Sequence, residues 1–335
     1  MEKSKRSAFR AALPTAAALA WITGCYVGGL WLLAQPHPGM VLAGVLPLAS
    51  AMVMAAYLIH DCAHTAVFRS PLANRRLAAC LGWITGSCFT PAAAIVEKHM
   101  LHHRERVDNV SFDYRHLLRT RPRLTRWLRA LEWCYLPAVD WLMRALAIAA
   151  PFFVPGLEQR RPRVLLVGGI RATAFAALGL ANPWALAAYA LAWCLYLHVL
   201  RFLDCFQHTY ALCVATDPRQ FQDVARPPRE YEEANTWSNP ISLRWPWLNW
   251  LVLNFPFHNV HHQQPQAPWH ALQRLHVARY GELAAHTLPP GLTLRNYHRF
   301  RVTRVLDDYG QTPGEGLPDR ENFVGALGVS FLTQY

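Results

Sequence analysis

The chain has 335 residues, of which 53% are hydrophobic and 16% are charged. A soluble domain usually carries about 25% charged residues, so this composition disfavours an ordinary soluble protein and favours a membrane protein. The formal net charge is +12 at pH 7, and the basic residues flank apolar segments, which favours contact with anionic membrane lipid and disfavours nucleic acid as a partner.

The first apolar segment contains two candidate membrane spans. Between Arg10 and Asp61 the chain has no Asp, Glu, Lys or Arg, and a helix of about 20 apolar residues is long enough to cross a bilayer. Two prolines interrupt the segment in QPHPG, at residues 35–39. We therefore predict a hairpin of two transmembrane helices over residues 14–34 and 40–60.

Two further uncharged segments follow. Residues 77–96 contain glycine, threonine, serine and proline, which is more typical of a buried or re-entrant helix than of a spanning helix. A second hairpin is predicted over residues 164–182 and 183–203, because residues 172–200 are uncharged and Asn182-Pro183 marks a turn between them. Arg171, inside the third predicted span, is expected to reach the interface or to pair within the bundle.

Basic residues predict how these helices are oriented. Lysines and arginines precede the first and third spans, and neither turn contains one. The positive-inside rule then predicts both termini in the cytoplasm and both turns outside. We expect a single all-α domain over residues 1–335, with four transmembrane helices in two hairpins, in a bacterial inner membrane. Residues 204–335 are expected to be mainly cytoplasmic and to contribute to a helical cap.

Histidines are concentrated in three short motifs: HDCAH at 60–64, HMLHH at 99–103 and HNVHH at 258–262. Residues three and four apart share one face of a helix, so each motif presents its imidazoles together. Eight imidazoles exceed the four ligands of a structural zinc site, and they suit two metal ions that accept nitrogen ligands. The candidate metal ligands are His60, His64, His99, His102, His103, His258, His261 and His262. A shared site requires residues 77–96 not to cross the bilayer.

The order of the three motifs, with a hairpin before the first and another between the second and third, resembles the membrane fatty acid desaturase superfamily of histidine-box di-iron enzymes. The resemblance covers roughly residues 40–275. It also extends to RFLDCFQHTY at 201–210, where the superfamily often has an additional metal-binding histidine and this chain has His208.

The resemblance implies two iron ions as cofactors, O₂ as co-substrate, and an active site at the cytoplasmic surface. It implies oxidation of an unactivated C–H bond in an acyl chain carried by a lipid, by coenzyme A or by acyl carrier protein. A separate electron donor, such as a ferredoxin, is expected. We expect desaturation of the acyl chain, and no catalytic group beyond the metal centre.

Other functions remain open. The first motif has the short HxxxH form, which hydroxylases and ketolases of the same superfamily also use, so a lipid or carotenoid hydroxylase or ketolase is the nearest alternative. A membrane zinc hydrolase would need about three protein ligands and an activated water. A metal transporter is a weaker alternative, because transporter sites usually lie near the bilayer midplane whereas these histidines lie at span ends.

Three aspartates are candidates for orienting the histidines. A metal-binding histidine usually donates its other N–H to a carboxylate or a carbonyl. Asp61 directly follows His60, Asp108 follows the second motif, and Asp204 lies four residues before His208.

Overall fold

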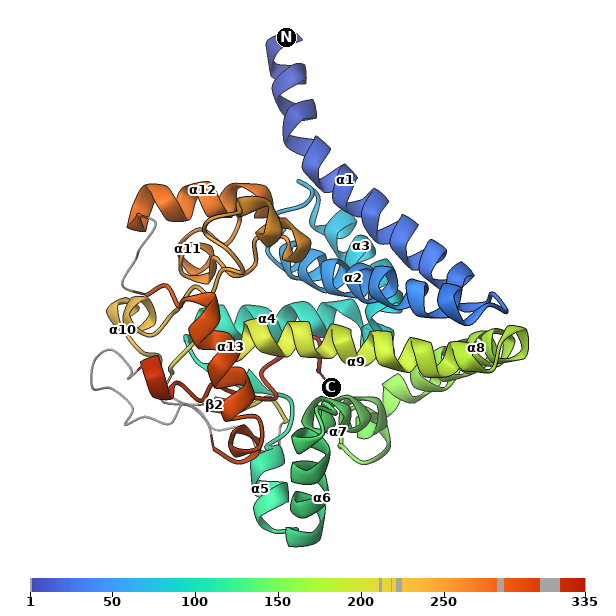
Figure 1. The fold of residues 1–335 in the computed structure, drawn as a ribbon. Helices are drawn as coiled ribbons and strands as arrows, with labels where there is room; N and C mark the ends of the chain where they lie inside the picture. The colour runs from blue at the N-terminus through green and yellow to red at the C-terminus, as the bar shows by residue number, and fades with distance from the viewer. Residues whose placement is uncertain are drawn as a thin grey trace.

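The structure, a computed structural model, describes the backbone of residues 2–11 and all atoms of residues 12–210, 213–217, 219–220, 225–281, 286–307 and 320–334. These residues form a mostly helical protein (Figure 1). Four long helices extend to one side of it. They are α1 (Glu2–Leu33), α2 (Pro38–Ala63), α8 (Arg161–Ala181) and α9 (Trp184–Asp204).

Four helical segments are long and apolar enough to cross a membrane, and they match the four predicted spans to within a few residues at each end. The segments are Ala12–Leu33, Pro38–Ala63, Glu158–Ala181 and Trp184–Asp204. In the second segment, 72% of an apolar stretch of 18 residues is buried, compared with 22% of such a stretch in the first segment and 11% in the third. The second helix, α2, is therefore the centre of the bundle, and it packs against α1, α3 and α9.

The close packing of α1 on α2 follows from small residues and from a defined helix start. A Cβ atom on Gly44 would lie 2.5 Å from the Leu33 side chain and 2.8 Å from the Gly29 carbonyl oxygen, so the two backbones approach where side chains are absent. His37 accepts a hydrogen bond from the backbone N–H of Gly39 at 3.1 Å, and Pro38 occupies the first turn of α2. Both features favour a helix that begins at this point.

The prediction of one helix over residues 77–96 is wrong. The chain forms α3 (Pro71–Thr85), a 3₁₀ turn η1 (Ser87–Phe89) and α4 (Ala92–Glu105). Gly86 ends α3 with a φ of +78°, a conformation that glycine adopts without steric cost. Neither α3 nor α4 is among the helices long and apolar enough to span, in the part of the chain that the structure describes.

Three arginines hydrogen-bond the backbone carbonyls at this break. Arg171 donates to the carbonyl of Trp83 at 3.0 Å, Arg144 to that of Thr85 at 3.4 Å, and Arg163 to that of Cys88 at 2.9 Å. The last carbonyls of a helix have no partner within it and carry partial negative charge, so cations satisfy them well. Arg171 thus forms its hydrogen bond inside the helix bundle, which is one of the two positions that the sequence predicted for it.

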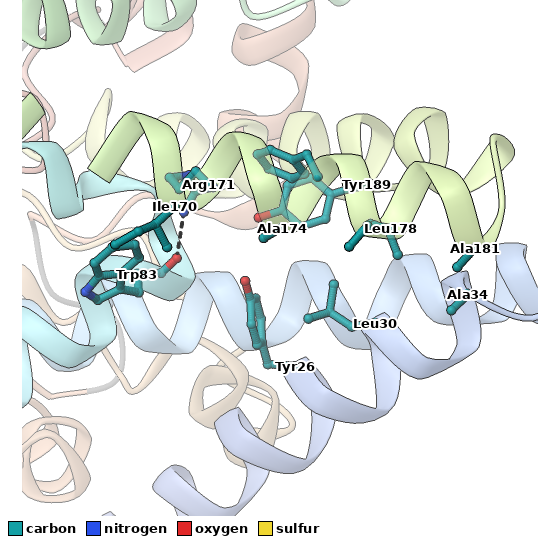
Figure 2. A pocket seen from close by; sticks show the side chains of 12 residues that line it. Tyr26, Leu30, Ala34, Trp83, Ile170, Arg171, Ala174, Leu178, Ala181 and Tyr189 are labelled. Atoms are coloured by element: carbon teal, nitrogen blue, oxygen red, sulfur yellow. Dashed lines mark hydrogen bonds between the residues drawn. The ribbon is translucent and has the colours of Figure 1, made fainter. Parts of the chain in front are cut away.

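Arg171 also lies at one end of an apolar groove of about 410 Å³ between α1, α3, α8 and α9. Figure 2 shows the bond from Arg171 to Trp83 at that end, with Leu30 and Leu178 farther along the groove. None of the nine candidate histidines lines this groove.

The mostly helical structure agrees with the all-α expectation, and a small two-stranded parallel sheet adds to it. Strand β1 (Asp108–Val110) pairs with β2 (Cys213–Ala215), with Asn109 opposite Val214. Strands of three residues are too short to show an alternating pattern in the sequence. The pairing holds the chain after α4 beside the chain after α9.

Shorter elements surround the inner ends of α2 and α9, away from the two interhelical turns (Figure 1). Between the second and third long helices they are α5 (Tyr114–Arg119), α6 (Pro122–Trp133), α7 (Ala138–Ala149), η2 (Ala150–Phe152) and η3 (Glu158–Arg160). After α9 they are α10 (Arg229–Ala234), η4 (Pro246–Val252), α11 (His258–Gln263), α12 (Trp269–Tyr280), α13 (Pro290–Arg299), η5 (Thr303–Val305) and η6 (Arg320–Asn322).

A buried ion triad attaches α9 to α6 and α7. Arg201 bonds Glu132 at 2.5 Å and Asp140 at 2.8 Å. The side chains of Arg201 and Glu132 are 4% and 1% exposed, and that of Asp140 is 12% exposed. The arginine therefore compensates two carboxylates that water barely reaches.

We expect Arg201→Met to destabilise the protein by about 3–5 kcal/mol, because the loss of the cation leaves buried carboxylates uncompensated. Thermal unfolding in detergent micelles measures the effect. Arg229→Met is the matched control, since Arg229 pairs with Glu233 where the side chains are 60% and 44% exposed, and such pairs contribute about 0–1 kcal/mol. Equal melting temperatures for both variants would contradict a structural role of the triad.

Candidate metal centre

The nine histidines singled out in the sequence lie in two adjoining groups. Within each group, one ring nitrogen from every residue lies within 4.8 Å of the others. The five-histidine group consists of His60, His64, His99, His103 and His261. The four-histidine group consists of His102, His208, His258 and His262.

The helical spacing of the motifs explains how they divide between the groups. On α4, His99 and His103 are four residues apart and belong to the five-histidine group, while His102 belongs to the four-histidine group. On α11 the assignment is reversed. His258 and His262, which are four residues apart, belong to the four-histidine group, and His261 belongs to the five-histidine group. Each HxxHH motif therefore contributes to both groups.

The remaining ligand candidates come from the ends of the two central helices. His60 lies in the last turn of α2 and His64 is its C-cap residue. His208 follows α9 and forms an isolated bridge with Thr236. Four segments that are distant in sequence thus meet where α2 and α9 end.

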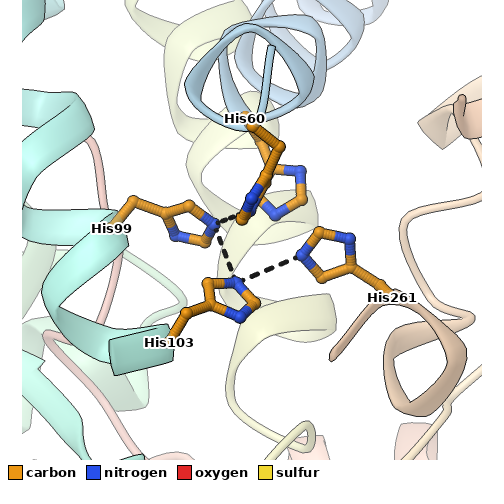
Figure 3. Close-up of side chains that lie close together, drawn as sticks. His60, His99, His103 and His261 are labelled. Carbon is orange, nitrogen blue, oxygen red and sulfur yellow. Dashed lines mark hydrogen bonds between the residues drawn. The ribbon is translucent and has the colours of Figure 1, made fainter. Parts of the chain in front are cut away.

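The ring nitrogens that face one another are all Nε2 atoms. In the five-histidine group, Nε2 of His99 lies 2.7 Å from that of His64 and 3.1 Å from that of His103, which in turn lies 3.2 Å from that of His261. Figure 3 shows the rings of His60, His99, His103 and His261 pointing toward a common point. In the four-histidine group, Nε2 of His258 lies 2.9 Å from that of His208 and 3.0 Å from that of His262.

This arrangement fits metal ions. The Nε2 atom of His60 is buried and has no hydrogen-bond partner among the described residues. An unpaired buried polar group costs free energy, and a bound cation would remove that cost. Imidazole nitrogen suits iron, zinc, copper and nickel, so the donor set alone accepts iron without selecting it.

Burial keeps these imidazoles in the neutral form that binds metal. It lowers the pKa of His102 and of His262 to about 4 each, and that of His64 to about 3. Burial also lowers the pKa of His99 and His208 well below the usual value. A metal ligand must be deprotonated, so the rings are ready to bind at neutral pH.

Several Nδ1 atoms have acceptors that fix the ring orientation. His262 Nδ1 lies 2.8 Å from the Glu232 carboxylate, and His102 Nδ1 lies 2.8 Å from the Val107 carbonyl oxygen. Such hydrogen bonds hold the tautomer and orientation that leave Nε2 free for the metal.

Two of the three predicted aspartates, Asp61 and Asp108, lie beside the Nδ1 atoms of site histidines, and Asp204 does not. Asp108 lies 3.7 Å from His102 Nδ1, farther than the Val107 carbonyl, and Asp61 lies 3.4 Å from His60 Nδ1. Asp204 makes no hydrogen bond to any of the nine histidines in the described part of the chain, and its Oδ1 atom is buried without a partner. Its carboxylate lines a small cavity beside the site.

Glu232 is the main residue that the sequence did not reveal. Besides its bond to His262, it forms an ion pair with Arg106 at 3.0 Å, and an oxygen of it lies within 4.8 Å of a ring nitrogen of both His103 and His262. It lies on α10, far in sequence from every histidine motif, and no spacing relates it to them.

A cavity of about 40 Å³ adjoins both groups. Its walls include His99 from one group and His208 from the other, together with Asp204, Gln207 and Phe331. A water needs about 10–15 Å³ measured in this way, and ligand pockets have about 300–1,000 Å³. In this conformation the cavity can therefore hold nothing larger than small molecules.

We expect Glu232→Ala to weaken metal binding by about 10–100-fold, because His262 loses the acceptor that orients it. Metal content after dialysis against a graded series of chelator concentrations measures this. Glu233→Ala, an exposed neighbour on the same helix, is the control and should match the wild type. Equal metal retention in both variants would remove Glu232 from the site.

We expect His208→Ala to reduce the bound metal from two ions per chain to one, because it takes one of four nitrogens from a single group. Elemental analysis of the purified protein measures the ratio. His116→Ala replaces an exposed histidine outside both groups and should keep both ions. Two ions retained in the His208 variant would contradict its assignment.

Comparison with known proteins agrees with the geometry. A model of the fatty acid desaturase family matches residues 36–291, which is more than half of the chain and includes all nine histidines. No curated protein matches the sequence. The family and the four long apolar helices indicate a membrane protein. The chain belongs to the fatty acid desaturase family.

Proposed function

We propose that the protein is an O₂-dependent di-iron enzyme that introduces a double bond into an acyl chain. The observation that carries the proposal is the convergence of nine imidazoles into two adjoining groups, in a chain that belongs to the fatty acid desaturase family. Two iron ions bound by these groups would supply the activation of O₂ and the removal of hydrogen from an unactivated C–H bond.

The chain's own residues have three tasks in this proposal. The five-histidine and four-histidine groups would each hold one ion through ring nitrogens. Glu232 and the Val107 carbonyl orient the rings of His262 and His102. Phe255 covers the centre from the α2 side, with its ring centroid 4.9 Å from that of His60 and 5.5 Å from that of His258. Such aromatic cover excludes water, which prevents side reactions of a reactive centre.

The proposed substrate is an acyl chain carried by a lipid, by coenzyme A or by acyl carrier protein, and the proposed electron donor is a separate protein such as a ferredoxin. A basic surface on α5 and α6 supports an anionic carrier or donor, because acidic partners are attracted to it over long distances. Its exposed arginines are Arg119, Arg121, Arg123, Arg126 and Arg129.

We further propose that α1–α2 and α8–α9 are two transmembrane hairpins and that the metal centre lies at the cytoplasmic face beneath a helical cap. Arg161 and Arg163 begin α8 at the same end of the bundle at which α2 presents His60 and His64, and the 34–37 turn contains no Lys or Arg. The positive-inside rule favours this orientation.

The nearest competing function is hydroxylation or ketone formation on a lipid or carotenoid. The short first motif supports it, because α2 contributes only His60 and His64 to the centre. A zinc hydrolase is disfavoured, since a catalytic zinc uses about three protein ligands and leaves the other imidazoles without a role.

Expression in a host with a known lipid profile tests the proposal. We expect a new acyl product that is two hydrogens lighter, formed only in the presence of O₂ and localised by mass spectrometry of the double bond. The His261→Ala variant is the inactive control, because it removes a nitrogen of the five-histidine group. A product that carries added oxygen instead would favour the hydroxylase or ketolase, and O₂-independent activity with one bound zinc would favour the hydrolase.

A further inference from the structure

The last described segment of the chain, Phe323–Gln334, lies inside the protein. Residues 323–328 and 331–333 are buried, and the segment lines a small pocket together with Leu197 and Arg201 of α9, which Figure 1 shows beside the end of the chain. Phe331 and Leu332 belong to the same hydrophobic cluster as α2 and α9. Because the segment is buried, specific contacts hold it in place, and these contacts indicate what it is for.

Lys98 is the main anchor of this segment. Its Nζ atom donates to the carbonyls of Ser330 and Thr333, each at 2.8 Å, and the side chain is 1% exposed. Lys98 lies on α4 directly before His99, so the anchor and a candidate metal ligand share one turn of helix.

Other polar groups complete the attachment. Thr90 donates to the Gln334 carbonyl at 2.5 Å, and Thr216 donates to the Gln334 side chain at 2.8 Å. Ser111 donates to the Thr333 carbonyl. The segment is thereby bonded to the start of α4, to the end of β1 and to the end of β2.

Two glycines allow the segment to approach its neighbours closely. Gly325 and Gly328 have φ values of +80° and +79°. A Cβ atom on Gly325 would lie 2.5 Å from the Cys205 carbonyl oxygen, and one on Gly328 would lie 2.7 Å from the Tyr114 ring. Both positions therefore combine a backbone conformation that favours glycine with a space that admits only glycine.

The segment ends beside the metal centre. The Phe331 ring centroid lies 5.7 Å from that of His60 and 5.5 Å from that of His99. Phe331 and Val329 also form part of the wall of the 40 Å³ cavity that adjoins both histidine groups. An acyl chain is too large for this cavity in the present conformation, so an acyl carbon that reaches both groups by this route must displace a residue of the wall, and Phe331 is one of the two phenylalanines in that wall.

We propose that the C-terminal segment forms one wall of the route by which the acyl chain reaches the histidine groups, and that Phe331 determines which carbon of the acyl chain reaches the metal centre. Lys98 is the positioning residue that sets the place of this wall. The inference rests on the proposed acyl-chain oxidation and adds a residue that selects the site of reaction.

The first experiment compares the products of the full-length Phe331→Leu and Phe323→Leu variants. Both replace a buried phenylalanine of the same segment, but Phe323 packs on Phe206, away from the cavity. We expect at least a twofold change in the ratio of positional isomers for the Phe331 variant and none for the Phe323 variant. Iron content per chain should stay the same in both.

The second experiment measures hydrogen exchange in the full-length Lys98→Met variant, which keeps an unbranched side chain and removes the donor to both carbonyls. Exchange of the amides in residues 323–334 should become at least tenfold faster, and the product ratio should shift as it does for Phe331→Leu. A general loss of structure would instead raise exchange in α2 as well.

The outcomes separate the two proposals. An active wild type whose Phe331→Leu variant keeps the same product positions would overturn this inference alone. Unchanged exchange in Lys98→Met would overturn the anchoring role. A wild type that oxidises no lipid would overturn the proposed function and this inference with it.

Discussion

The structure depends on bringing nine imidazoles together in two adjoining groups, with six of the nine histidines buried. No single helix can do this, since one face of a helix offers only residues three and four apart. The two groups therefore need histidines from four segments that meet at one place. These segments are the ends of α2 and α9, the helix α4 and the short helix α11. The small β1–β2 sheet contributes by holding the chains that leave α4 and α9 side by side. The rest of the fold is arranged around this meeting point.

Satisfaction of backbone groups is a second constraint. The break between α3 and α4 exposes carbonyls in a largely apolar part of the molecule, where unpaired polar groups are costly. Arg144 from α7 and Arg163 and Arg171 from α8 donate to them. These bonds fix the break against α7 and α8, and α4 begins four residues after Cys88, the last residue with a bonded carbonyl. The arginines thus contribute to the position of the histidines on α4.

The sequence was sufficient for what depends on local patterns. Uncharged runs of about 20 residues identified the four long helices, and the spacing of the three motifs identified eight of the histidines. His208 needed the family resemblance, because a single histidine has no spacing to recognise. The break at Gly86 was missed because residues 77–96 contain no charged residue and therefore predict a single helix. Glu232 and Phe331 were missed because only tertiary structure brings α10 and the C-terminal segment to the histidines.

The position of Lys98 links the two constraints. Successive residues on an α-helix point about 100° apart, so Lys98 and His99 project from α4 in different directions. His99 faces the metal centre, while Lys98 reaches the carbonyls of Ser330 and Thr333. A helix rotation that moved His99 away from its group would also release the C-terminal segment. Three of the nine histidines and the anchor of the C-terminal segment are therefore carried by one helix, so α4 contributes to the distance between the histidine groups and that segment.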